Sequence, residues 1–319
     1  MFRDNCVVTS VRLPTIIFVV CFVSISECVP ALHASDRCGI VAAGGMTTQE
    51  SNPSEPAWAV QFATLSDRGT ERTNNEDACG TYALTPTHIV VAVADGVSGE
   101  EGGEIASQMA ISVALRAYIE SPGAWDPLKR IYRAAQQANI EIHDRALVVT
   151  ELRRMSTTLT AVVIEGGVAH AAHVGDSRLY LVSGGTIDQK TKDHTVVGER
   201  RRIGLMSAER AKAHPDRSVL TRSLGRELIA ALDRLSFPVA GGDTLVVCSD
   251  GLYNILEDDE IRELVGAGDP EQACRALVEA ANARGTPDNL TAGVVEITGQ
   301  TPDPQAPGLR GLFSKWFAL

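Results

Sequence analysis

Short runs of β-branched and other apolar residues recur along the chain, separated by polar or glycine-containing segments. Several of these runs are apolar at every position, which is typical of strands that are covered on both faces of a sheet. We therefore predict strands at Val60–Leu65, His88–Ala94, Thr158–Ile164, Ala169–Val174, Arg178–Val182, Thr244–Cys248 and Leu290–Ile297.

Three longer segments have the spacing of helices. The first, Glu101–Tyr118, has apolar residues four positions apart, at Ile105, Met109, Val113 and Ala117. The second begins at Asp126-Pro127, an N-cap residue followed by a proline at the first helical position, and runs to about residue 147. The third begins at Asp269-Pro270 and ends at Gly285.

The order of these elements favours two sheets. A pair of long helices separates the second predicted strand from the third, which suggests two sheets packed face to face with helices outside them. A dinucleotide-binding fold would need strict alternation of strand and helix and a glycine-rich first turn, and the chain has neither. We therefore predict an α+β fold.

The composition is that of a globular protein with an acidic surplus. The chain has 319 residues and a mass of 34.0 kDa, with 44% hydrophobic and 22% charged residues and a mean hydropathy of +0.01. These values exclude a disordered, collagen-like or polytopic membrane protein. The net charge of −11 argues against nucleic acid as the main partner, because binding to phosphate backbones needs a basic face.

Residues 1–45 differ from the rest of the chain. The apolar run at 14–24 is too short to span a bilayer comfortably and is typical of a signal peptide, although the cleavage site at Leu32-His33-Ala34 is a poor match. Two interpretations stay open: an exported or membrane-associated protein, or a true start at Met46. The three cysteines beyond this segment are widely spaced, which favours a reducing, cytoplasmic compartment.

The remaining boundaries follow from composition. Residues 46–57 are polar and predict a flexible lead-in, whereas residues 58–298 contain no repeat or linker and predict one domain. Residues 299–319 predict a proline-rich linker and an amphipathic tail, with an apolar stripe at Leu309, Leu312, Phe313, Trp316 and Phe317. The tail either packs on its own domain or docks on a partner or a membrane.

Acidic residues stand at the ends of the predicted strands. Asp95, Asp176 and Asp250 follow apolar strands, and Asp288 precedes the last one. If these strand ends converge, several negative charges share one small space, which is stable only when cations fill it. Ligands that offer only oxygen select hard ions such as Mg²⁺ or Mn²⁺. The alternative for any single Asp-Gly pair is an ordinary turn.

Other chemistries find less support in the sequence. No P-loop, dinucleotide fingerprint or G-x-S-x-G motif is present. His170 and His173 have the spacing of a zinc-binding pair, but on a strand residues three apart point to opposite faces. Metal-assisted hydrolysis is the chemistry that remains.

Seven motifs, in this order, resemble a known family. They are Ser66–Asp77, Val93–Val97, Ser156–Thr160, Val174–Arg178, Leu220–Gly225, Cys248–Leu252 and Thr286–Leu290. Together they resemble bacterial members of the metal-dependent protein phosphatase family (PPM, type 2C), over residues 58–298. The resemblance implies a four-layer α-β-β-α sandwich, in which two antiparallel β-sheets are flanked by helix pairs, and a centre of two Mn²⁺ or Mg²⁺ ions.

The resemblance also implies ligands for these ions. Asp95 is expected to bridge the two ions, and the other ligands are expected to be the Gly96 carbonyl, Asp250, Asp288, and either Glu76 or Asp77. Asp176 matches an aspartate associated with a third, weaker ion. Asn289 is expected to support the ligands without touching an ion.

Substrate contacts follow from the same likeness. Arg72 matches the arginine that holds the substrate phosphate, where its planar fork neutralises charge that grows in the transition state. The alternative is a surface arginine paired with Glu71 or Glu76. Two ions lower the pKa of a bridging water, so that a hydroxide attacks phosphorus in line. Val97 stands where eukaryotic members carry a histidine that is proposed to protonate the leaving oxygen, and valine donates no proton.

We therefore expect a serine/threonine phosphatase that reverses a cognate kinase, with phosphorylated proteins as partners and a monomeric state. The alternative is a catalytically silent phosphoprotein-binding module of the same fold. The segment Lys192–Arg217 resembles the family's flap beside the active site. Its basic cluster, Arg200–Arg202, either steers phosphorylated peptides or forms a solvated helix face.

Overall fold

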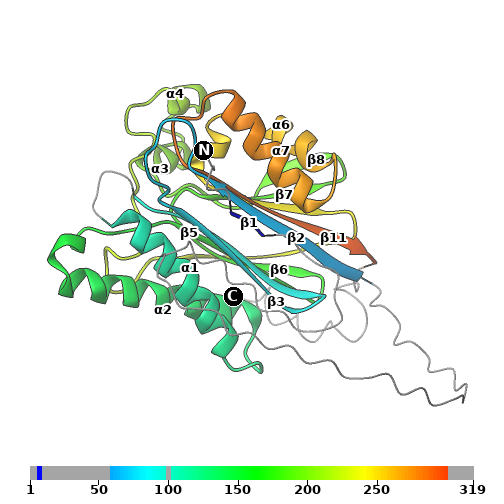
Figure 1. Ribbon diagram of the computed structural model, residues 1–319, viewed down its shortest axis with the longest axis horizontal. Helices are drawn as coiled ribbons and strands as arrows, with labels where there is room; N and C mark the ends of the chain where they lie inside the picture. The colour runs from blue at the N-terminus through cyan, green and yellow to red at the C-terminus, as the bar shows by residue number, and fades with distance from the viewer. Residues whose placement is uncertain (1–5, 9–57, 98–101, 301–319) are drawn as a thin grey trace, which may run out of the picture.

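The computed structural model describes residues 6–8, 58–97 and 102–300. Two antiparallel sheets pack face to face, and helices cover the outer side of each (Figure 1). The predicted α+β sandwich with four layers is confirmed. The predictions for residues 1–5, 9–57 and 301–319, and the predicted helix start at Glu101, lie outside the described residues. In the described part of the chain, no helix combines the length and the apolar character needed to cross a bilayer.

One sheet has five strands in the order β3-β4-β5-β6-β9. Their bounds are Asp77–Thr85, His88–Asp95, Leu159–Glu165, Val168–Val174 and Asp233–Pro238. Every residue of β4 from His88 to Ala94 is buried, as its continuous apolar sequence predicts. The outer face of this sheet is covered by two helices, α1 (Gly103–Glu120) and α2 (Pro127–Val148).

The other sheet has the order β1-β2-β11-β10-β7-β8. Its strands are Cys6–Val8, Trp58–Asp67, Leu290–Gly299, Thr244–Cys248, Arg178–Ser183 and Thr186–Gln189. The edge strand β1 pairs with Thr64–Ser66 of β2. The helices on this side are α5 (Asp250–Tyr253), α6 (Asp258–Val265) and α7 (Pro270–Ala283). The remaining helical turns are η1 (Thr150–Leu152), α3 (Val196–Arg202) and α4 (Ala208–Lys212).

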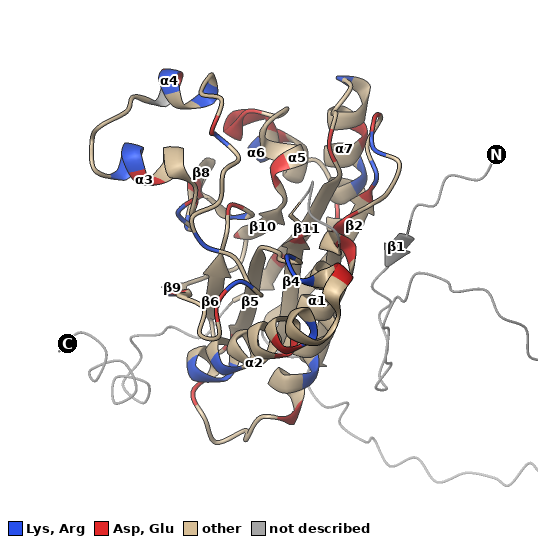
Figure 2. Cartoon of the chain, turned by 90° about the vertical axis from the view of Figure 1, so that its left-hand side faces the viewer, with Lys and Arg blue, Asp and Glu red and all other residues tan. Residues whose placement is uncertain are grey.

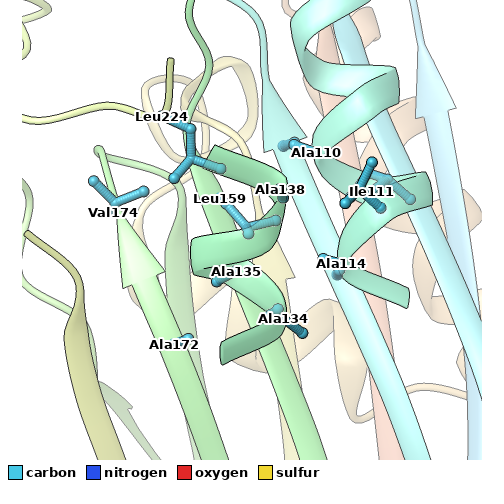
Figure 3. Close-up of a cluster of buried hydrophobic side chains, with 14 of the residues drawn as sticks. Ala110, Ile111, Ala114, Ala134, Ala135, Ala138, Leu159, Ala172, Val174 and Leu224 are labelled. Carbon is cyan, nitrogen blue, oxygen red and sulfur yellow. The ribbon is translucent and has the colours of Figure 1, made fainter. Parts of the chain in front are cut away.

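Small residues let the helices lie close to the first sheet (Figure 3). The spacing that predicted this helix is confirmed by α1. Of its four apolar positions Val113 is buried, whereas Ile105, Met109 and Ala117 are only partly buried, and the face that meets the sheet centres on Ala106, Ala110 and Ala114. The opposing face of α2 is equally small, with Ala134, Ala135 and Ala138. Alanine has no long side chain to hold the helix away, so the helix axes approach the sheet and each other.

The strand ends that carry the acidic candidates lie at one end of the sandwich, where β11 begins (Figure 1). Antiparallel pairing places the last residue of one strand beside the first residue of its neighbour. Asp95, which ends β4, is thus paired with Asp77, which begins β3. In the second sheet, Asp67 at the end of β2 is paired with Leu290 at the start of β11.

Candidate active site

Five carboxylates act on one another at this end of the sheets. Burial raises the pKa of Asp95 well above its ordinary value, and four neighbouring negative charges raise it further: those of Asp77, Asp250, Asp176 and Asp288. Burial likewise raises the pKa of Asp250 to about 6, with Asp288 adding to the effect and Arg72 opposing it. The pairing of Asp77 with Asp95 and the effect of these charges on one another show that the strand ends converge, which is the condition set in the sequence analysis for a cation site.

Asp77 has one oxygen that is fully bonded and one that is not. Its Oδ2 accepts hydrogen bonds from the hydroxyls of Ser249 and Thr291, each at 2.7 Å. Its Oδ1 is buried and has no hydrogen-bond partner among the described residues. Burial raises the pKa of Asp77 to about 7, and the two hydroxyls oppose that shift. An orphaned, buried carboxylate oxygen is costly unless a cation or a proton satisfies it.

The backbone of Asp95 is fixed by two threonines that the sequence analysis did not single out as site residues. Thr157 Oγ1 donates to the carbonyl of Asp95 at 2.9 Å, and the amide of Asp95 donates to Thr158 Oγ1 at 2.9 Å. The amide of Thr158 also reaches the Asp95 carbonyl at 2.9 Å. Both threonines are buried, and their place directly before β5, opposite the end of β4, was the available signal.

Gly96 is required by the close approach of two chain segments. A Cβ at this position would lie 2.3 Å from the carbonyl oxygen of Gly103. Its amide donates to the Glu76 carbonyl at 3.0 Å, which joins the segment before β3 to the end of β4. Any side chain at residue 96 would therefore push α1 away from the site.

Asn289 fastens the loop that carries Arg72. Its side-chain oxygen accepts from the amide of Glu76 at 2.8 Å, and its side-chain nitrogen donates to the carbonyls of Arg68 and Asn74 at 2.9 and 2.8 Å. The side chain is almost fully buried. Asn289 thus orders the 68–76 loop.

Arg72 pairs with Asp288, at 2.9 Å from Nη2 to Oδ1, rather than with Glu71 or Glu76. Both side chains are 35% exposed, so the guanidinium lies at the mouth of the acidic cluster. Within the described residues, no three His, Cys, Asp or Glu side chains stand in an arrangement that would hold an ion as they are. In this arrangement the Asp288 carboxylate is occupied by the guanidinium of Arg72.

The donor set nevertheless fits hard divalent ions. It consists of carboxylate oxygens with mutually raised pKa values and one orphaned oxygen, which is the environment that a cation relieves. The two candidate zinc ligands are occupied elsewhere, since His173 bonds Thr160 and the Lys192 carbonyl, and His170 bonds Ser236.

Residues 192–217, which resemble the family's flap and are called the flap below, project beyond the sheets at the same end (Figure 2). It contains α3 and α4, and the arginines at the end of α3 are exposed. Arg202 is paired with Glu199 one turn earlier, at 2.7 Å. The cluster Arg200–Arg202 therefore faces solvent, and a role in steering peptides stays a prediction.

Residues 68–292 match the family model described as Protein phosphatase 2C. The chain belongs to the protein phosphatase 2C family. It is 34% identical over 234 residues to the serine/threonine phosphatase stp of Listeria monocytogenes, which covers 72% of this chain and 93% of that protein.

A second relative is longer than this chain. The serine/threonine protein phosphatase PstP of Mycobacterium tuberculosis is 34% identical over 256 residues, which covers 80% of this chain but only 48% of PstP. A crystal structure of the catalytic domain of PstP in complex with two manganese ions superposes with a TM-score of 0.66 and 33% identity, over 76% of this chain and 99% of that domain. This protein phosphatase 2C member thus shares its fold with the catalytic domain of PstP, which was crystallised with manganese bound.

Proposed function

We propose that this chain is a metal-dependent protein serine/threonine phosphatase that hydrolyses phosphoserine and phosphothreonine and reverses the action of a cognate kinase. The observation that carries the proposal is the convergence of Asp77, Asp95, Asp176, Asp250 and Asp288 beside Arg72 at one end of the sandwich. The names of the relatives support the substrate class.

In this proposal the chain holds two Mn²⁺ or Mg²⁺ ions. Asp95, the carbonyl of Gly96, Asp250 and Asp288 would hold them. Asp77 is favoured over Glu76 as a further ligand, because its charge raises the pKa of Asp95 and its Oδ1 lacks a partner among the described residues. Asp176 serves a third, weaker ion.

When bound, such ions supply a hydroxide nucleophile near neutral pH and neutralise charge on the phosphate. The protein's own residues bind and orient the substrate. Arg72, at the mouth of the acidic cluster, would bind the phosphate oxygens through its guanidinium. The loop held by Asn289 keeps Arg72 in place. Residue 97 is valine, so the proton for the leaving hydroxyl comes from another group.

The test is hydrolysis of a phosphothreonine peptide and of p-nitrophenyl phosphate by the full chain, with and without Mn²⁺. We expect Mn²⁺-dependent turnover that falls by more than about 100-fold in Asp95→Asn. The matched control is Asp259→Asn, since Asp259 is 84% exposed and pairs only with Arg262 among the described residues. A wild-type rate no higher than background, or an Asp95→Asn rate equal to wild type, would contradict the proposal. Peptide binding without hydrolysis would favour the silent module.

A further inference from the structure

The turn that carries Asp176 is held by the base of the flap. Three consecutive residues there, Lys192, Asp193 and His194, which we call the flap stem, each bond to a residue close to Asp176 in sequence. The first contact is from His173, whose Nε2 donates to the Lys192 carbonyl at 3.0 Å. His173 is buried at the end of β6, three residues before Asp176.

The second contact runs through Arg178. Its Nε and Nη2 donate to the two carboxylate oxygens of Asp193 at 3.0 and 2.7 Å, which is the bidentate geometry of a strong pair. The same guanidinium lies 3.6 Å from the centre of the Tyr253 ring, and the Tyr253 hydroxyl donates to the carbonyl of Asp176 at 3.0 Å. Arg178 therefore joins the flap stem to the helix that begins at Asp250.

The third contact is made by His194. Its backbone amide donates to the Gly175 carbonyl at 2.8 Å, and the amide of Gly175 donates to His194 Nδ1 at 3.2 Å. His194 Nε2 lies 3.3 Å from Asp233 Oδ2. The amide of Gly175 can only donate, so Nδ1 accepts and the ring proton is on Nε2, which faces Asp233 and also lies 3.4 Å from Arg222 Nη1. Nδ1 of the imidazole thus accepts from Gly175, the residue directly before Asp176.

The flap stem is also packed tightly against the flap helix. Thr195 caps α3 by accepting from the amide of Gly198 at 2.9 Å. A Cβ at Gly198 would lie 2.3 Å from the carbonyl oxygen of Asp193, so the helix presses directly on the stem. Arg222 adds a bridge from Glu199 of α3 to Asp233, at 3.4 and 3.1 Å. A displacement of α3 must therefore move Asp193 and His194.

We propose that His194 is a positioning residue for Asp176, and that with the Arg178–Asp193 pair it transmits the position of the flap to that carboxylate. This inference rests on the proposed function, because Asp176 matters there as the ligand of the weaker ion. The turn has little freedom of its own: Gly175 has φ of +101°, and a Cβ there would lie 2.5 Å from Thr158 Cγ2. The His194 ring accepts from the Gly175 amide and so fixes the start of this turn.

The experiment is calorimetric titration of the metal-stripped full chain with Mn²⁺. Asp176→Asn identifies the weaker class of sites in the wild-type isotherm. We expect His194→Leu to weaken that class by about 10- to 100-fold and to leave the tighter class unchanged. His194→Asn should stay near wild type, because its side-chain oxygen can accept from Gly175 at the place of Nδ1. The control is His170→Leu, since His170 bonds Ser236 away from the stem.

A second variant tests the inference in case His194→Leu does not fold. Arg178→Lys keeps the charge but loses the bidentate fork, so it should weaken the same class, and circular dichroism should stay unchanged. The inference is wrong if folded His194→Leu gives the wild-type isotherm, if His194→Asn is as weak as His194→Leu, or if the wild type has no Asp176-dependent class. A wild type that binds Mn²⁺ in both classes but hydrolyses no phosphothreonine peptide would reject the proposed function and leave the inference standing.

Discussion

At the scale of single residues, Asp77 lowers the stability of the metal-free protein and is suited to binding a cation. One of its oxygens is satisfied by two buried hydroxyls, while the other is buried without a partner in the described part of the chain. Burial and the charges of Asp250 and Asp288 raise its pKa to about 7. An isolated protein gains nothing from such a group. It is explained by a ligand that neutralises the cluster.

We therefore predict opposite effects of Asp77→Asn on stability and on binding. Asparagine keeps an oxygen for Ser249 and Thr291 but removes the charge, so the metal-free protein should gain about 1–3 kcal/mol at pH 8. The rise in Tm caused by saturating Mn²⁺ should shrink. Thermal unfolding with EDTA and with Mn²⁺ measures both effects. Asp188→Asn, on the surface beside Lys190, is the control, and a variant less stable than wild type in EDTA would contradict the argument.

The sequence predicts some site residues better than others, for a physical reason. An aspartate at the end of a continuous apolar strand, such as Asp95, is located by that strand. The choice between Glu76 and Asp77 depends on strand register, because neighbouring residues point to opposite sides and one position of slip exchanges them. The register became known only with β3, whose first residue pairs with Asp95.

At the scale of elements, three strands that the sequence analysis did not predict, β3, β8 and β9, have weak apolar patterns. β9 alternates between half-buried and exposed residues at the edge of its sheet, and β8 is a four-residue edge strand. β3 contains Gly80, which leaves room for α1, since a Cβ there would lie 2.5 Å from Ile111 Cγ2. The central strands are apolar on both faces and were predicted. Edge strands carry polar residues, so their pattern resembles that of loops.

Helix α2 supports the site from a distance through Asn139. This side chain is fully buried, and it donates to the carbonyls of Glu227 and Leu228 at 2.9 and 3.1 Å and accepts from the amide of Gly225 at 2.9 Å. The segment it holds continues from Leu224, whose backbone pairs with Thr157 beside Asp95. One helical residue thus orders a loop that packs against the site.

We predict that Asn139→Leu destabilises the protein by about 2–4 kcal/mol, because three backbone groups lose their partners while the volume is kept. Urea unfolding at equilibrium measures the loss. The control is Gln137→Leu on the exposed side of the same helix, where the side chain bonds only Glu141 among the described residues. Equal midpoints for the two variants would show that the loop does not depend on Asn139.

At the scale of the whole molecule, the fold brings repelling charges together and three apolar clusters hold them there. One cluster lies between the sheets, and one lies under the helices on each side. Strand ends that are as far apart in the sequence as Asp67 and Leu290 lie next to each other at this end of the sheets. The repulsion between their carboxylates is stored in the folded state, so the stability of the molecule is linked to pH and to divalent ions.

The sign of this linkage follows from the pKa values. Those of Asp77 and Asp250 are raised to about 7 and about 6 from 3.8, so between about pH 4 and pH 7 the folded state binds more protons than the unfolded chain. In EDTA, this cluster should therefore lower the stability as the pH rises through that window.

Mn²⁺ binds the ionised carboxylates without competing protons at higher pH, so the gain in Tm should be larger at pH 8 than at pH 5.5. At 100 times Kd the ion contributes about 2.7 kcal/mol. Scans at both pH values, with EDTA or Mn²⁺, measure the difference. An equal or larger gain at pH 5.5 would show that ions do not bind at these carboxylates.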